Sequence, residues 1–166
     1  DKDAVTSTLL ACEIAAEAKA AGSSFYRELL QCYVDFGCYR ERLVSLTKKG
    51  MDGAKEITKM MVRFRENPPE SLDGSAIVRI ADYSTSRSLD TRSGEETPID
   101  LPKSNVLIFF TEEGTRLAAR PSGTEPKIKF YMSANAPMER PSDYEATKAR
   151  LEAKFDRILS ELKLDA

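Results

Sequence analysis

The sequence contains no histidine. This absence excludes serine–histidine and cysteine–histidine nucleophilic pairs, histidine-ligated zinc and acid–base catalysis by imidazole. Cysteine is also scarce, because the chain has three, an odd number without metal-ligand spacing. Free thiols of this kind indicate a reducing, cytoplasmic environment. The apolar neighbours of the first two predict buried thiols on helices. The three residues are Cys12, Cys32 and Cys38.

Long apolar runs and a strong charge excess are missing as well. No stretch approaches the roughly 18 continuous apolar residues that indicate a membrane-spanning helix. The opening Asp1-Lys2-Asp3 lacks the basic and then apolar form of a signal peptide. A net charge of −2 and an isoelectric point near 5.4 argue against general polyanion binding. We therefore expect neither a nucleic-acid partner nor a membrane partner.

Two helices are predicted at the beginning of the chain. Residues 4–20 are rich in alanine and carry apolar side chains at helical spacing, with Asp3 as the N-cap. Residues 25–36 repeat apolar side chains at the same spacing until Gly37 supplies a stop. The apolar faces of this helical pair indicate packing against something outside the segment.

The rest of the chain mixes strand and helix patterns. A helix is predicted between Lys49 and Asn67, and a capping box over 142–145 begins a closing helix that reaches Leu162. The polar stretch 82–105 predicts a long loop. Strands are predicted over 39–46, 76–81, 106–111, 115–120 and 127–133. The order predicts an α+β fold, in which helices cover one face of a small antiparallel sheet of about four strands.

The most distinctive segment is Arg120-Pro121-Ser122-Gly123-Thr124-Glu125-Pro126, which joins two predicted strands. The two prolines fix the backbone on either side, while Gly123 lets the amides between them turn toward one point. Amides, the hydroxyls of Ser122 and Thr124, and the Arg120 guanidinium can then converge on an anion. The same residue types also form ordinary turns, so composition alone favours neither reading.

The strand after this loop alternates basic and apolar residues. Lys127 and Lys129 are predicted on one face, with Ile128 and Phe130 on the other. Glu125 would repel phosphate, so we expect it to orient the loop or Arg120.

The heptapeptide, together with the Lys127-Ile128-Lys129-Phe130-Tyr131 that follows, resembles the phosphate-binding loop of the last domain of α-D-phosphohexomutases. This is the phosphoglucomutase and phosphomannomutase family. A similar Asp-Lys-Asp opens a helix late in the family's third domain. Residues 1–38 therefore resemble the tail of the third domain, and 39–166 the whole fourth domain. The implied contacts to the substrate phosphate come from Arg120, Ser122, Gly123, Thr124 and Lys129.

The resemblance also implies an activity for the complete enzyme. That enzyme is an isomerase that moves a phosphoryl group between two oxygens of a sugar phosphate, through a sugar bisphosphate, using a phosphoserine and Mg²⁺. The sequence shows no serine loop, metal loop or sugar-selecting loop of the family's type. We therefore expect no catalytic residue, metal ligand or cofactor in this chain. The implied partners are a glucose, mannose or pentose phosphate and the upstream domains of the same chain.

Two other functions stay open. A stand-alone regulator that binds sugar phosphates would use the same loop. A nucleic-acid-binding module would instead use a basic strand face with an aromatic residue beside it, made of Arg116, Lys127, Lys129 and Tyr131.

Overall fold

The computed structural model describes residues 3–48 and 50–164. These residues form two compact units. The first contains residues 3–39 and 136–149, and the second contains 40–135 and 150–164. The predicted division at residue 38 into parts of two domains stays a prediction. No helix among the described residues is long and apolar enough to cross a membrane.

The first unit is built on the two predicted helices, α1 (Ala4–Ala20) and α2 (Phe25–Phe36). Asp3 caps α1 as predicted, because its carboxylate accepts the amide of Thr6 at 2.9 Å. The other two residues of the predicted opening motif lie outside the described residues. Gly37 ends α2 with a φ of 94°, and its amide donates to the carbonyl of Tyr33.

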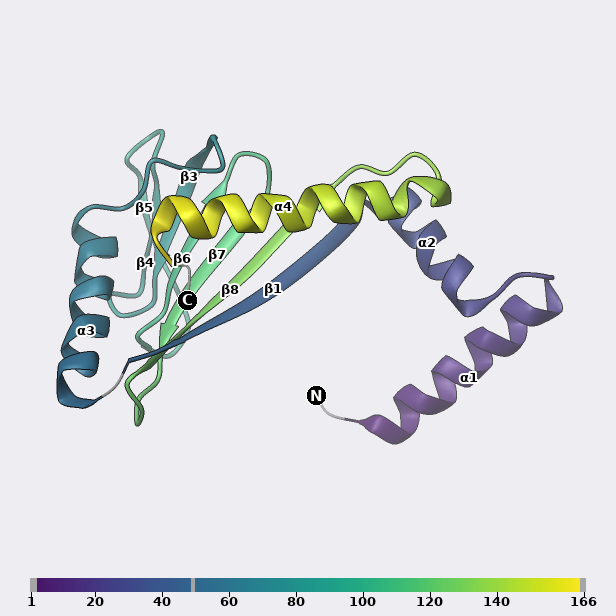
Figure 1. The fold of residues 1–166 in the computed structure, drawn as a ribbon, viewed down its shortest axis with the longest axis horizontal. Helices are drawn as coiled ribbons and strands as arrows, with labels where there is room; N and C mark the ends of the chain where they lie inside the picture. Colours follow the sequence, from purple (N-terminus) through teal and green to yellow (C-terminus); the bar gives the residue numbers. More distant parts are fainter. Residues whose placement is uncertain (1–2, 49, 165–166) are drawn as a thin grey trace. The chain divides into compact units, whose positions relative to one another are not determined.

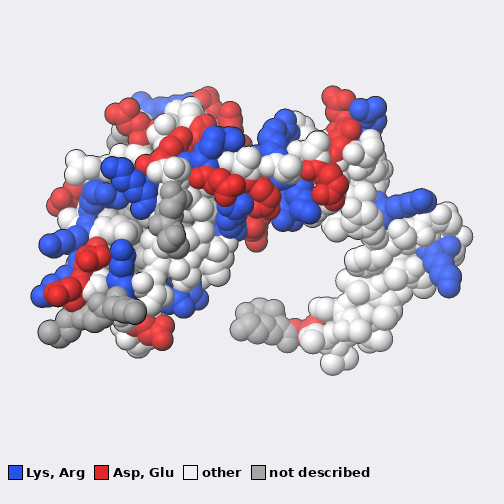
Figure 2. Space-filling model, viewed as in Figure 1, with Lys and Arg blue, Asp and Glu red and all other residues white. Residues whose placement is uncertain are grey.

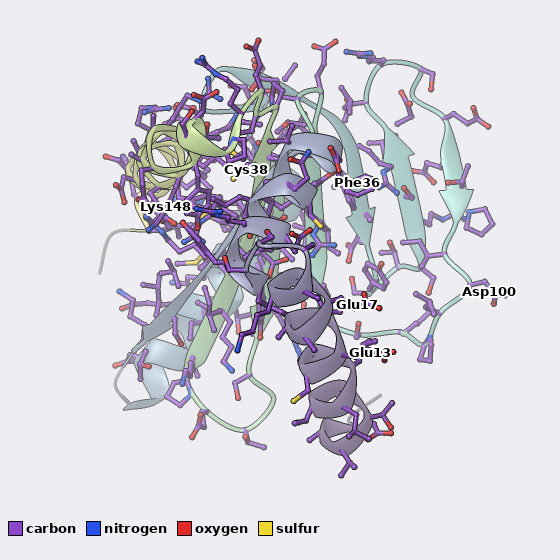
Figure 3. All side chains as sticks on the ribbon, turned by 90° about the vertical axis from the view of Figure 1, so that its right-hand side faces the viewer. Glu13, Glu17, Phe36, Cys38, Asp100 and Lys148 are labelled. Atoms are coloured by element: carbon purple, nitrogen blue, oxygen red, sulfur yellow. The ribbon has the colours of Figure 1, made fainter. Side chains whose placement is uncertain are left out.

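The surface of this unit is unusually apolar. Only Ala18 of α1 is buried, and Figure 2 shows few charged side chains over the face of α1 that it presents. Glu13 and Glu17 lie along one side of the helix in Figure 3. The predicted burial of the first two thiols is wrong, because no described residue covers those helix faces. The large apolar side chains exposed on the two helices are Val5, Leu9, Leu10, Ile14, Phe25, Tyr26, Leu29 and Phe36, while Cys12 and Cys32 are exposed and Cys38 is buried.

The sheet of the described residues has eight strands and is antiparallel, so it is larger than the four predicted. Seven strands run in the order β1-β8-β7-β6-β3-β4-β5, and the short β2 pairs with β3 outside this path. Their bounds are Cys38–Thr47 for β1, Ser71–Leu72 for β2, Ser75–Asp82 for β3, Arg87–Asp90 for β4, Glu96–Pro98 for β5, Leu107–Thr111 for β6, Arg116–Pro121 for β7 and Lys127–Ala136 for β8.

The additional strands β4 and β5 arise where the sequence predicts a loop. They form a hairpin at the edge of the sheet, with Ser88 opposite Thr97. The Asp90 carboxylate accepts the amides of Arg92 and Ser93 and so fixes the turn. All three residues of β5 are exposed, so no apolar alternation marks this strand in the sequence.

Two helices cover one face of the sheet (Figure 1), α3 (Gly50–Glu66) and α4 (Tyr144–Leu162). Phe64 of α3 meets Phe109 and Phe130 edge to face, with ring centroids 6.0 and 6.2 Å apart. The predicted capping box is wrong. A short 3-10 helix over Pro141–Asp143 precedes α4, and the hydroxyl of Ser142 donates to the Asp143 carboxylate instead. The apolar face of α4 is confirmed, with Thr147, Leu151, Phe155, Ile158 and Leu162 buried.

The alternation predicted for β8 is confirmed along its whole length. Ile128 and Phe130 are 0% exposed and face the helices, while Lys127, Lys129 and Tyr131 are half-buried on the other side. One face of the sheet is therefore a packed core and the other is open. The candidate site lies on the open face, where β7 and β8 are joined.

Candidate anion-binding site

The register of β7 and β8 places two predicted site residues side by side. Arg120 is the direct cross-strand partner of Lys129. Opposite residues of an antiparallel pair have Cβ atoms about 5 Å apart and project to the same face of the sheet. Arg120 is exposed and Lys129 is half-buried. Two positive charges thus stand next to each other at the entrance to the loop.

The backbone of the loop is partly committed to internal hydrogen bonds. The amide of Ser122 donates to the carbonyl of Lys127 at 2.7 Å. The hydroxyl of Ser122 accepts the amides of Thr124 and Glu125 at 3.4 and 3.2 Å, which are long contacts. The amide of Gly123 makes no hydrogen bond within the described residues. Of the four amides between the two prolines, that of Ser122 is therefore fully occupied and those of Thr124 and Glu125 are weakly bound, while that of Gly123 is available.

Gly123 does not use the conformational freedom of glycine here, because its φ lies outside the left-handed region. A Cβ atom built at this position would meet no heavy atom within 4 Å. The space above its backbone is open, so a bound molecule can approach the main chain closely. The contribution of glycine is thus the missing side chain rather than an unusual turn.

A cavity of about 230 Å³ lies between the loop and the open face of the strands. It brings together four of the five predicted site residues, Arg120, Ser122, Gly123 and Lys129. Within the described residues, neither Arg120 nor Lys129 takes part in an ion pair. The remaining lining residues are Pro121, Glu125, Lys127 and Tyr131. Three cations and one carboxylate leave the lining with a net positive charge.

Sequence reasoning did not place Lys127 and Tyr131 in this site. The signal that could have found them is the period of two in β8, which puts both on the face of Lys129. The sequence predicts that Glu125 orients the loop or Arg120. Its carboxylate lines the cavity without an ion-pair partner among the described residues, whereas its backbone makes hydrogen bonds with Ser122 and Lys127 inside the loop.

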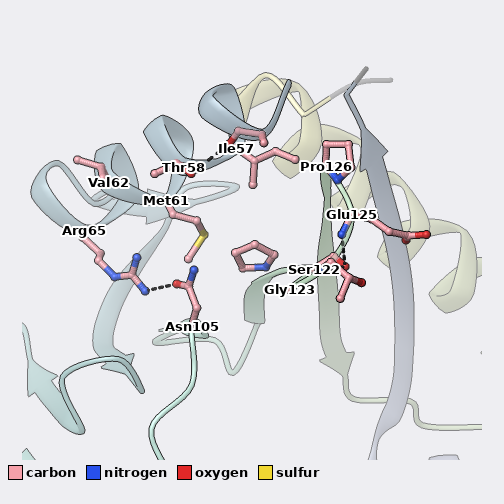
Figure 4. Close-up of a pocket in the computed structure, with 13 residues that line it drawn as sticks. Ile57, Thr58, Met61, Val62, Arg65, Asn105, Ser122, Gly123, Glu125 and Pro126 are labelled. Carbon is pink, nitrogen blue, oxygen red and sulfur yellow. Dashed lines mark hydrogen bonds between the residues drawn. The ribbon is translucent and has the colours of Figure 1, made fainter. Parts of the chain in front are cut away.

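Thr124 takes a different position from the other predicted residues. It lines a second cavity, of about 620 Å³, between the loop and α3. Apolar side chains of α3, including Ile57 and Met61, line this cavity with the loop (Figure 4). At one end Arg65 donates to the side-chain oxygen of Asn105 at 2.7 Å. Four loop residues line both cavities, namely Pro121, Ser122, Gly123 and Glu125.

Arg65 also holds the carboxylate of Asp82, with Nε 3.0 Å from Oδ2. Burial raises the pKa of Asp82, but hydrogen bonds from Arg65 and Ser84 outweigh it and the pKa lies below its ordinary value. Because this pair is neutralised, we assign the Arg65 guanidinium a structural role. The described residues contain no group of three histidine, cysteine, aspartate or glutamate side chains that could hold a metal ion.

Comparison with known proteins gives related sequences over most of the chain. It is 42% identical to phosphoglucomutase of Staphylococcus aureus strain MRSA252 over 137 residues, which are 82% of this chain and 25% of that protein. The phosphoglucomutase of strain USA300 is 41% identical over the same length. No family model matches the sequence.

These identities show homology between the chain and proteins of the phosphoglucomutase type, over part of their length. In particular, the chain is a homologue of phosphoglucomutase. The chain spans about a quarter of the length of the curated relatives it matches. Among solved structures, the open form of pp63/parafusin, a phosphoglucomutase from Paramecium, overlaps 84% of this chain and 23% of its own. The TM-score of this overlap is 0.41, and the two sequences are 12% identical.

Proposed function

We propose that this chain is the phosphate-binding domain of a phosphoglucomutase-type enzyme, an isomerase of carbohydrate metabolism. The observation that carries the proposal is the pair of cations Arg120 and Lys129, which lie opposite each other beside Ser122 and have no ion-pair partner among the described residues. Such an arrangement suits a phosphate dianion, because guanidinium and ammonium groups form charge-assisted hydrogen bonds to its oxygens.

In this proposal the domain holds the phosphate that does not react. Fixing one end of a phosphorylated sugar positions the other end at the phosphoserine of the enzyme, which lies outside this chain. Positioning alone can supply a large part of a rate enhancement. In this proposal both phosphates of a sugar bisphosphate occupy the site in turn. A site that contacts mainly the phosphate group, and few sugar hydroxyls, can bind the intermediate in either orientation. This chain by itself is expected to bind and not to catalyse.

The Mg²⁺ of the complete enzyme does not fit the residues described here. Carboxylate ligands would have to cluster around the ion, and no such group of side chains exists among these residues. We propose that the ligands of this ion come from other parts of the complete enzyme.

The upstream domains of the same enzyme are the proposed partners of the first unit. The apolar side chains of a helix are normally buried, yet α1 exposes Leu9, Leu10 and Ile14 and buries only Ala18 in its unit. Exposed apolar surface of this extent indicates a contact with another protein surface.

Titration of the chain with inorganic phosphate tests the proposed function. Amide NMR signals of residues 122–124 should shift first, in the wild-type chain. Arg120→Ala should weaken phosphate binding about 10- to 150-fold, the equivalent of one charge-assisted hydrogen bond of about 1.5–3 kcal/mol. Arg116→Ala is the matched control, because Arg116 lies on the same strand face but does not line the cavity.

Equal effects of the two substitutions would contradict a specific site. Tight, salt-sensitive binding of single-stranded RNA that sugar phosphates fail to displace would favour the nucleic-acid alternative. A stand-alone regulator would require a full-strength response to sugar phosphate without any other domain, with dissociation constants in the micromolar range.

A further inference from the structure

The second cavity, between the loop and α3, has the size and the lining of a small-molecule site. Its volume of about 620 Å³ lies within the range of about 300–1,000 Å³ that is typical of such sites. Ile57 and Met61 line it and are only 5% and 2% exposed. Val62 also lines it and is 43% exposed, so a molecule in solution can reach the cavity. The other apolar residues of the lining are Ala54, Pro121 and Pro126.

A hydrogen-bond donor is available at one end of this cavity. The side-chain oxygen of Asn105 accepts Nη2 of Arg65 at 2.7 Å, which holds the amide group in place. Its nitrogen, Nδ2, makes no hydrogen bond to any described residue, and Figure 4 shows it directed toward Met61. The carbonyl oxygen of a bound molecule could accept this donor.

The charges around the cavity favour a neutral ligand. Arg65 is the only cation among the described lining residues, and its Nε lies 3.0 Å from Oδ2 of Asp82. A carboxylate or phosphate would therefore find no uncompensated positive charge here. Glu125 lines the cavity as well, but its carboxylate points away from Ile57 and Met61 in Figure 4. The lining thus offers an apolar surface and a neutral donor to a ligand.

We propose that the cavity between the loop and α3 binds a small neutral molecule with an apolar ring system and one carbonyl oxygen. The ring system lies against Ile57 and Met61, and the oxygen accepts Nδ2 of Asn105. This site is separate from the anion-binding cavity, and its existence does not depend on the proposed function.

The two cavities are linked through the loop, since Pro121, Ser122, Gly123 and Glu125 line both. Both cavities are present in the same conformation of the loop, so a ligand in either one stabilises the conformation that the other requires. Such coupling is reciprocal. We therefore expect the neutral ligand to tighten the binding of phosphate. This coupling, unlike the site itself, rests on the proposed function.

Amide NMR titrations of the chain with two neutral probes test the site. The first, α-tetralone, is a fused-ring ketone, and the second, tetralin, has the same rings without the carbonyl group. Both should shift signals of residues 57–62 and 121–125. Asn105→Asp keeps the oxygen that accepts Arg65 but removes the donor. It should weaken binding of α-tetralone about 3- to 10-fold, as expected for one hydrogen bond, and leave binding of tetralin unchanged.

A matched pair of substitutions on α3 locates the probes. Thr58 and Lys59 are both exposed, but only Thr58 lines the cavity. Thr58→Phe places a ring in the cavity and should abolish the shifts in these residues, whereas Lys59→Phe should leave them unchanged. Equal behaviour of the two variants, or shifts confined to α1 and α2, would overturn the site. An equal loss of both probes in Asn105→Asp would overturn the role of Asn105.

A phosphate titration in the presence of saturating α-tetralone tests the coupling. The affinity of the wild-type chain for inorganic phosphate should rise about fivefold. An unchanged or lower affinity would overturn the coupling. Failure of the wild-type chain to bind phosphate at all would overturn the proposed function and the coupling with it, while the site would still stand on the α-tetralone titration.

Discussion

The two faces of the sheet differ in whether their arginine and lysine side chains have ion-pair partners. On the face covered by α4, Arg40 and Arg42 of β1 both bind the Glu152 carboxylate, at 2.8 and 2.6 Å. On the open face, Arg120 and Lys129 lie directly opposite each other and neither has an ion-pair partner among the described residues. Similar side chains on neighbouring strands are thus neutralised on one face and left charged on the other.

This difference separates charges that hold the fold from charges kept for a ligand. Like charges directly opposite each other destabilise an antiparallel pair. A sequence usually violates such a local rule where function requires it. The open face is therefore where changes should alter binding without unfolding, and the covered face is where they should do the reverse.

Phe130→Ala should produce the largest effect in the molecule. Phe130 is 0% exposed and packs against Phe64, and removal of a buried phenylalanine side chain costs about 3–5 kcal/mol. Urea denaturation followed by circular dichroism measures this loss. Its neighbour Lys129→Gln, on the open face, should change the free energy of unfolding by less than about 0.5 kcal/mol. Comparable losses in the two variants would contradict the division between faces.

Glu152→Gln should give the next largest effect, about 1 kcal/mol of stability at pH 7. Hydrogen bonds from Arg40 and then Arg42 hold the pKa of Glu152 below its ordinary value of 4.5. A depressed folded pKa stabilises the fold at pH values above 4.5, and this contribution is lost as pH falls through the lower folded value. Denaturation midpoints between pH 7 and pH 3 should therefore fall less in the variant than in the wild type. Parallel curves would show that the pair contributes nothing.

Gly123→Ala should weaken phosphate binding several-fold and leave stability within about 0.5 kcal/mol. The backbone at Gly123 needs no glycine and the added methyl group meets nothing in the free chain, but it would occupy the path of an approaching anion. Thermal denaturation and a phosphate titration of the same sample measure the two quantities. Gly94→Ala would not serve as a control. Gly94 has a φ of 75°, in the left-handed region, so an alanine there would strain the backbone. Unaltered phosphate affinity would place the anion away from the loop backbone.

The pH dependence of binding should be the smallest effect. A phosphate monoester has its second pKa near 6, so its dianion fraction, and with it the affinity, should fall about fourfold between pH 7.5 and pH 5.5. Arginine and lysine remain charged throughout this range. Sulfate, a dianion at both pH values, is the control and should bind equally at each. A matching decline with sulfate would locate the titrating group on the protein.

The sequence alone predicted the local structure correctly where one residue pattern determines one conformation. The alternation around Phe130 and the helix cap at Asp3 follow from local periodicity and capping chemistry, and both are confirmed. The β4–β5 hairpin could not be predicted, because an exposed edge pair is held by backbone hydrogen bonds and carries no apolar signal. The exposure of Cys12 depends on what covers its helix, which the local sequence does not encode.

The candidate site also has features that the sequence predicts and features that it does not. Strand alternation predicted that Lys127 and Lys129 share a face, and the family resemblance named Arg120 and Lys129 as phosphate contacts. The structure pairs Arg120 with Lys129 and brings both to one cavity with Ser122 and Gly123. The hydrogen bond that occupies the amide of Ser122 and the turn of Thr124 toward α3 depend on the detailed path of the loop. Whether these residues bind phosphate stays a prediction.

The opposition of Arg120 and Lys129 has a practical consequence for handling this protein. A dianion between the two side chains would replace their mutual repulsion with attraction, and any ligand that binds only the folded state raises the melting temperature. Buffer composition then becomes an experimental variable. Melting curves recorded in phosphate would overstate the intrinsic stability of the chain, whereas curves recorded in a zwitterionic buffer at the same ionic strength would reveal it.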